Sequence, residues 1–121
     1  MNRHEEYRSQ KAVIEWFGKC WRVLGAPTES VLFHCPNGGK RKPGEAAMLK
    51  AEGVRAGVPD LILLLPRNGH HALLLELKTE TGRLSPAQSD FLETAATNGY
   101  KACVCFSTET AIQAITDYCR S

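Results

Sequence analysis

The sequence predicts an α/β protein in which helices flank a mixed β-sheet on both faces. Two almost wholly apolar runs, 61–65 and 71–75, are separated by a short segment that contains Asn68-Gly69, which is typical of two paired antiparallel strands. Segments with helical spacing of apolar residues precede and follow this pair, so the order of elements is α-β-α-β-β-α-β-α. A helix between two later strands allows a parallel crossover, and the predicted sheet is therefore mixed.

The predicted ends of the elements depend on capping and helix-stopping residues. Gly53 ends the second helix. Ser85, Pro86 and Gln88 form a capping-box pattern that begins the third helix, and Asn98-Gly99 ends it. Besides the strand pair, the elements in order are a helix at about 5–24, a strand at 31–35, helices at 44–52 and 86–98, a strand at 100–106, and a helix from Ser107 or Thr108.

The length of the loop between the two apolar runs decides which side chains share a face of the sheet. A two-residue Asn68-Gly69 loop would set Asp60 opposite Leu77, and so on the other face from Glu76. A three-residue loop at 67–69, with a bulge at its glycine, would set Asp60 opposite Glu76. We predict the second register, because it brings two carboxylates together.

Asp60, Glu76 and Lys78 form a candidate catalytic set. Glu76 and Lys78 are two apart in a strand and project from the same face. Carboxylates are hard oxygen ligands for Mg²⁺, and an ammonium orients water or stabilises the charge of a phosphorane, which is what phosphodiester hydrolysis requires. The hypothesis is therefore a metal-dependent nuclease.

Each motif alone also has a purely structural interpretation. Val58-Pro59-Asp60 is typical of a turn before a strand, and Leu-Glu-Leu-Lys at 75–78 is typical of a strand with one wet face. The neighbouring runs, however, are apolar enough to be buried on both faces. Charges at the ends of such strands cost free energy unless they are paired or bind a metal, which favours the functional interpretation.

Four spaced segments, 34–41, 49–61, 75–78 and 82–88, resemble the VRR-NUC domain family of the PD-(D/E)xK nuclease superfamily. The resemblance implies a restriction-endonuclease-like fold and a single VRR-NUC nuclease domain over residues 1–121. One departure is visible, because the Val-Arg-Arg that names the family is Val54-Arg55-Ala56 here.

The resemblance also implies a role for individual residues. Asp60, Glu76 and the carbonyl of Leu77 would hold Mg²⁺ or Mn²⁺, with Glu6 from the first helix as an additional acidic ligand. Lys78 would be the catalytic lysine. Gln88 would be a supporting polar residue, although the capping box alone would also account for it.

The net charge of +2 is unevenly distributed. Residues 37–56 carry five basic side chains against two acidic ones, and a basic stretch beside a metal site is suited to a polyanionic substrate. The alternative is a basic loop that is merely solvated. The candidate DNA-binding residues are Asn37, Gly38, Lys40, Arg41, Lys42, Lys50 and Arg55.

Composition restricts the remaining possibilities. The five cysteines lack the paired spacing of a zinc site, which predicts reduced thiols. No apolar run is long enough to span a bilayer, and together these features predict a cytoplasmic protein. A single small domain offers little surface for reading a base sequence, so we expect recognition of DNA structure.

Stand-alone proteins that this chain resembles look like Holliday-junction resolvases, which implies a homodimer. The apolar side chains of Trp16, Phe17, Trp21 and Phe33 exceed what a small core obviously needs, and part of this surplus could form the dimer interface. The alternatives are a flap or single-strand nuclease and a non-catalytic nucleic-acid-binding module.

Overall fold

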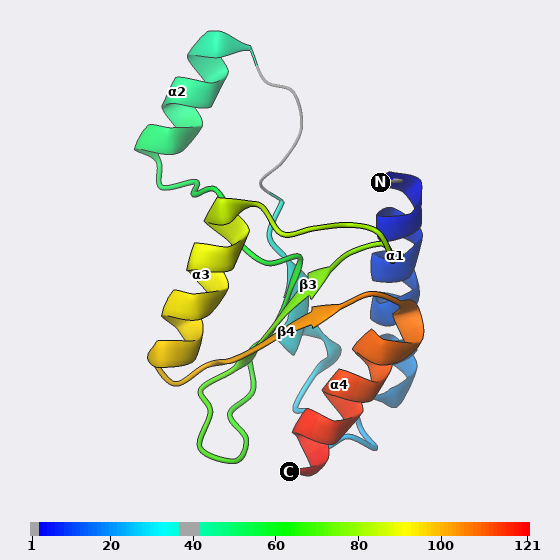
Figure 1. Ribbon diagram of the computed structural model, residues 1–121. Helices are drawn as coiled ribbons and strands as arrows, with labels where there is room; N and C mark the ends of the chain where they lie inside the picture. Colours follow the sequence, from blue (N-terminus) through cyan, green and yellow to red (C-terminus); the bar gives the residue numbers. More distant parts are fainter. Residues whose placement is uncertain (1–2, 37–41) are drawn as a thin grey trace.

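A four-stranded sheet lies between two layers of helices (Figure 1). The computed structural model describes residues 3–36 and 42–121. The elements are α1 (Arg3–Cys20), a 3₁₀ turn (Glu29–Val31), β1 (Leu32–His34), α2 (Pro43–Ala51), β2 (Leu61–Leu63), β3 (Leu73–Leu77), α3 (Pro86–Thr97), β4 (Lys101–Cys105) and α4 (Thr108–Arg120). The predicted order of elements is confirmed.

The sheet is mixed, as predicted. Its strand order is β1-β2-β3-β4, with antiparallel β1–β2 and β2–β3 pairs and a parallel β3–β4 pair. Helix α3 makes the crossover between the two parallel strands, since a parallel connection needs a return segment of this length. The carboxyl end of β3 therefore lies beside the carboxyl end of β4.

The predicted register of the strand pair is confirmed, but the predicted loop is wrong. Leu61 pairs with Leu75, and continuing this register by one residue sets Asp60 opposite Glu76. The tip is nevertheless the two-residue Asn68-Gly69 turn, closed by an Arg67–His70 bridge, in which both central residues have positive φ (47° and 81°). That turn type matches the twist of the strands. Between tip and strands, three residues (64–66) lie opposite two (71–72), and this bulge, rather than a longer loop, supplies the shift in register.

The larger part of the core lies on the sheet face covered by α1 and α4. Alternate residues of β3, namely Leu73, Leu75 and Leu77, point into it. On the opposite face Leu74 packs against Leu92 and Ala95 of α3. Glu76 follows Leu74 in this alternation, so its carboxylate points to the face of α3 rather than to the larger core.

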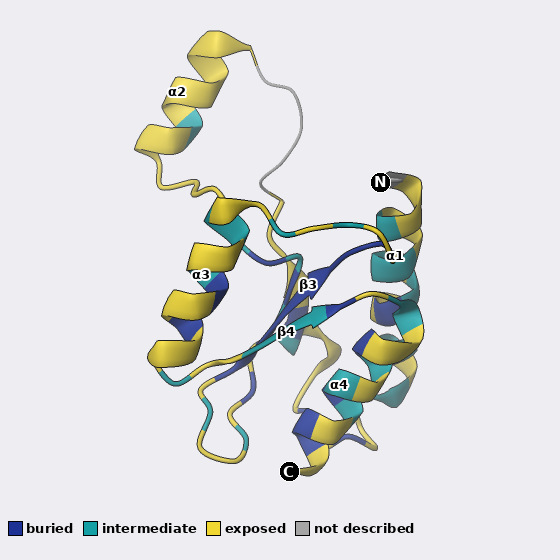
Figure 2. Ribbon diagram, viewed as in Figure 1, coloured by how far each residue is buried: buried dark blue, intermediate teal, exposed yellow. Residues whose placement is uncertain are grey.

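Helix α1 is shorter than predicted, and helix α2 lies apart from the core. Helix α1 ends at Cys20 instead of Leu24, because the chain turns at 21–25, where Gly25 has a φ of +83°. Helix α2 has no buried residue and makes no extensive contact with another described helix or strand, and it projects beyond the start of α3 (Figures 1 and 2). Within the described segments, no helix combines the length and apolarity needed to cross a bilayer.

The apolar surplus noted in the sequence is mostly used in the core. Phe17 is buried, and Trp16 and Trp21 pack partly against the same cluster. Phe33 remains 36% exposed and Leu64 61% exposed, on β1 and just after β2. Phe33 is thus the member of the predicted surplus that remains available for a partner, and Leu64 adds a second exposed apolar side chain.

Candidate active site

The candidate site lies where β3 ends and where α1 and α3 begin. The segment before Asp60 passes close to the amino end of α3, because Gly57 has a φ of +83° and a Cβ atom there would collide with the backbone carbonyl of Ala87. Only glycine allows this approach without strain. The glycine therefore places Asp60 next to the helix that carries Gln88.

Asp60 and Glu76 are brought together as predicted. Asp60 Oδ2 accepts a hydrogen bond of 2.6 Å from the backbone N–H of Leu77, which holds the carboxylate against the end of β3. The side chains of Asp60 and Glu76 also hydrogen-bond each other. Glu76 is only 2% exposed, so this carboxyl pair is shielded from solvent on the β3 side.

Gln88 has both of the roles that the sequence suggested. Its Oε1 accepts from the backbone N–H of Ser85 at 2.8 Å, which completes the capping box of α3. Its Nε2 then faces the other way and donates to Glu76 Oε1 at 3.2 Å. The helix cap thus sets the orientation of the amide that supports Glu76.

Burial raises the pKa of Glu76 to about 9, and the hydrogen bond and negative charge of Asp60 act in the same direction, while Lys78 opposes them. As a carboxylate, Glu76 would leave its Oε2 buried without a hydrogen-bond partner. Protonated, it donates to Asp60. Burial therefore favours the protonated form of Glu76 when no cation lies beside it.

The donor set fits a hydrated divalent cation. Glu76 Oε2 and Glu6 Oε2 are both buried oxygens that lack a hydrogen-bond partner in the described structure. Among residues 3–36 and 42–121, no three His, Cys, Asp or Glu side chains are close enough to form a complete metal cage. Mg²⁺ does not require one, because it commonly binds one or two carboxylates and keeps several waters for substrate phosphates to replace.

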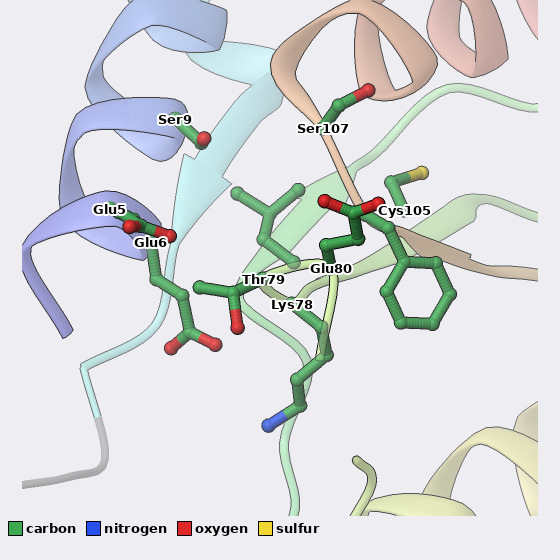
Figure 3. Close-up of a pocket in the computed structure, with 10 residues that line it drawn as sticks. Glu5, Glu6, Ser9, Lys78, Thr79, Glu80, Cys105 and Ser107 are labelled. Atoms are coloured by element: carbon green, nitrogen blue, oxygen red, sulfur yellow. The ribbon is translucent and has the colours of Figure 1, made fainter. Parts of the chain in front are cut away.

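Lys78 and Glu6 approach the site from different elements. Lys78 is 9% exposed, and its backbone N–H donates to the carbonyl of Cys105 at 2.9 Å, which continues the parallel ladder. Burial raises the pKa of Glu6; the charge of Lys78 lowers it and that of Asp60 raises it. Figure 3 shows the Glu6 carboxylate and the Lys78 side chain extending in the same direction beside Thr79.

Two residues near the site were not predicted from the sequence. His34, at the end of β1, donates from Nδ1 to the carbonyl oxygen of Asp60 at 2.6 Å and so supports the backbone that carries this carboxylate. Thr79 donates its backbone N–H to the Glu6 carboxylate. His34 lies in a segment that carried the family resemblance, whereas only its position next to Lys78 pointed to Thr79.

The structure describes only part of the predicted DNA-binding set. Lys42, Lys50 and Arg55 have exposed side chains on or beside α2. Arg55 also donates to the carbonyl oxygen of Lys50 at 3.3 Å. Asn37, Gly38, Lys40 and Arg41 lie outside the described residues.

Comparison with known proteins identifies the family. The family model of the VRR-NUC domain matches residues 4–109. The chain belongs to the VRR-NUC family. A solved structure of a VRR-NUC domain protein is 32% identical, with a TM-score of 0.81 over 98% of this chain and 90% of that one. A second VRR-NUC domain structure is 25% identical, with a TM-score of 0.57 over 94% of this chain and 97% of that one. No curated protein matches the sequence.

Membership of the VRR-NUC family gives the site its chemical context. The mixed sheet with flanking helices is the restriction-endonuclease-like fold that the sequence predicted. The chain is a nuclease domain, and a nuclease domain of this kind takes DNA as its substrate.

The buried carboxyl pair predicts a stability change. Because folding raises the pKa of Glu76, the unfolded chain releases this proton first, and stability of the metal-free protein falls as the pH rises from about 4.5 to about 9. In EDTA at pH 8, Glu76→Gln should raise the melting temperature by about 4 °C or more, the size expected for about 1 kcal/mol. Thermal unfolding at pH 5 and pH 8 measures the effect. Equal melting temperatures of variant and wild type at both pH values would contradict the raised pKa of Glu76.

Proposed function

We propose that the protein is a divalent-metal-dependent, structure-specific DNA endonuclease that hydrolyses phosphodiester bonds in the manner of a Holliday-junction resolvase. The observation that carries the proposal is the buried Asp60–Glu76 carboxyl pair with Lys78 beside it. Membership of a nuclease family supports it.

Each residue has a defined task in this proposal. Asp60, Glu76 and the carbonyl of Leu77 would hold Mg²⁺ or Mn²⁺, with Glu6 as a further acidic ligand. When bound, the ion supplies Lewis-acid stabilisation of the scissile phosphate and lowers the pKa of water. Lys78 stabilises the charge that develops on the phosphorane, in a site where burial strengthens electrostatic interactions. Gln88 holds Glu76 in place.

The basic stretch is proposed to bind the DNA backbone. Helix α2 projects at the end of the molecule where α1 and α3 begin, which is also the end that carries the candidate site (Figure 1). Its exposed cations therefore lie on the side from which a strand would enter. The intact carboxylate and lysine set favours catalysis over a non-catalytic binding module.

Replacing Lys42, Lys50 and Arg55 by Ala should weaken binding of all DNA sequences alike. The slope of log affinity against log salt should fall by about 0.9 for each phosphate that the variant no longer neutralises. Fluorescence anisotropy in Ca²⁺ or EDTA at several salt concentrations measures this. Lys19→Ala with Arg120→Ala, on α1 and α4, is the matched control, and a slope unchanged in the triple variant would assign these cations to solvent.

A homodimer is part of the proposal. A four-way junction has two-fold symmetry and requires two opposed cuts, and an isologous dimer matches this symmetry. Phe33 and Leu64, exposed on the β1–β2 half of the sheet, support such an interface, because they border an apolar groove of about 810 Å³.

Cleavage of a DNA panel tests the function. Four-way junction, flap, linear duplex and single-stranded DNA are incubated with Mg²⁺, Mn²⁺ or EDTA, and light scattering measures the assembly. We expect paired nicks on the junction, none in EDTA, and a mass of about 27 kDa, twice that of the 13.3 kDa chain. A monomer that makes single nicks on flaps would favour a flap nuclease, and binding without metal-dependent cleavage of any DNA would favour the non-catalytic module.

A further inference from the structure

We infer that Thr79 is a positioning residue of the active site, whose backbone amide and hydroxyl together hold the Glu6 carboxylate beside Lys78. This inference rests on the proposed function for its catalytic consequence. The link between Thr79 and Glu6 is itself a property of the metal-free fold.

The backbone around Thr79 is held from several sides. The N–H of Lys78, the preceding residue, bonds to the carbonyl of Cys105, and the carbonyl of Thr79 accepts from the N–H of Gly82 at 2.9 Å. The N–H of Thr79 donates to the Glu6 carboxylate, which joins the end of β3 to the first turns of α1. These hydrogen bonds hold the Thr79 backbone in one place relative to Glu6.

The Thr79 hydroxyl makes no direct hydrogen bond to another described residue. Thr79 is 8% exposed, and its Oγ1 is buried without a hydrogen-bond partner in the described structure. A buried hydroxyl that makes no hydrogen bond destabilises a protein, and valine would fill nearly the same volume at no such cost. The position therefore carries a polar group that packing alone would not favour.

Glu6 has a matching unpaired atom. Its Oε2 is also buried without a partner, and both residues line a pocket of about 190 Å³ that includes Ser9, Glu80 and Ser107. Figure 3 shows the hydroxyl of Thr79 and the carboxylate of Glu6 extending in the same direction within this pocket. A pocket of this size holds water, and a buried water usually bonds two to four polar groups. A water seated between Thr79 Oγ1 and Glu6 Oε2 satisfies both atoms and fixes the carboxylate.

A double-mutant cycle in EDTA tests the link without the metal. Thermal unfolding is compared for wild type, Thr79→Val, Glu6→Gln and the double variant. We expect the two single shifts not to add in the double variant, because either substitution alone already breaks the link between Thr79 and Glu6. Additive shifts would overturn the link.

The consequence for the site is measured on the same proteins. We expect Thr79→Val to weaken Mg²⁺ binding in calorimetry and to lower kcat, each by about 10- to 100-fold, as for partners of metal ligands. The KM for DNA should stay unchanged. Thr79→Ser, which keeps the hydroxyl, should restore both. Wild-type Mg²⁺ affinity and turnover in Thr79→Val, or a decrease that Thr79→Ser does not restore, would overturn the positioning role. A third outcome separates the two proposals. If the shifts of the variants are non-additive but the wild-type protein neither binds Mg²⁺ nor cuts DNA, the link between Thr79 and Glu6 is supported and the proposed function is contradicted.

Discussion

Asp60→Asn is expected to reduce cleavage at saturating Mg²⁺ and DNA by about 10³-fold or more, because it removes the charge of a proposed metal ligand. The fold should survive, since the asparagine oxygen still accepts the hydrogen bond that Asp60 Oδ2 receives from the Leu77 N–H. Removing the charge of Asp60 also removes one cause of the raised pKa of Glu76 in the metal-free protein. Single-turnover cleavage of a labelled junction measures the decrease.

The matched control for this variant is Glu93→Gln. Glu93 is an exposed residue of α3 and lies outside both the candidate site and the apolar groove. The control should cleave at the wild-type rate and melt at the wild-type temperature. Mg²⁺-dependent cleavage retained by Asp60→Asn would exclude Asp60 as a metal ligand.

Lys78→Met is expected to lower turnover by about 10²- to 10³-fold while Mg²⁺ binding survives. Methionine keeps much of the aliphatic stem and so preserves the packing of a residue that is only 9% exposed. The ammonium is removed, and with it the stabilisation of the phosphorane charge that we propose for Lys78. Calorimetry with Mg²⁺ and turnover on the junction, taken from one preparation, separate binding from chemistry.

Lys19→Met is the control for Lys78→Met, because Lys19 is exposed in the last turn of α1. It should leave both measurements unchanged. An unfolded Lys78→Met protein that also fails to bind Mg²⁺ would show that Lys78 acts as a structural ion-pair partner of Glu6 and Glu76.

The arrangement of Asp60 and Glu76 was predictable because the alternation of the strands and the chemistry of the site together selected one register. Alternation in the apolar runs assigned a face to Glu76, and the chemistry of a metal site selected the register. The tip of the hairpin was not predictable in the same way. Asn68-Gly69 formed the two-residue turn that its residues favour, and the compensating bulge at 64–66 left no signal in the sequence, since bulges tolerate most side chains.

The supporting residues were predictable only where a local rule applied. The capping box placed Gln88 in the first turn of α3, and its amide reaches Glu76 because Oε1 is already used by Ser85. The side chain of His34 bonds to the backbone carbonyl of Asp60, and the backbone N–H of Thr79 bonds to the side chain of Glu6. In each pair the two residues are far apart in the chain. Such interactions depend on how strands and helices dock, and periodicity carries no information about them.

The central claim is that Asp60 and Glu76 hold the metal ion on which cleavage depends. One Mg²⁺ titration, followed by calorimetry and by junction cleavage on the same preparations of wild type and Asp60→Asn, tests it most directly. The account predicts that binding and cleavage in the wild type rise over the same range of Mg²⁺ concentration, and that Asp60→Asn shows neither. Cleavage by the wild type in EDTA, or cleavage by Asp60→Asn with the wild-type dependence on Mg²⁺, would contradict it.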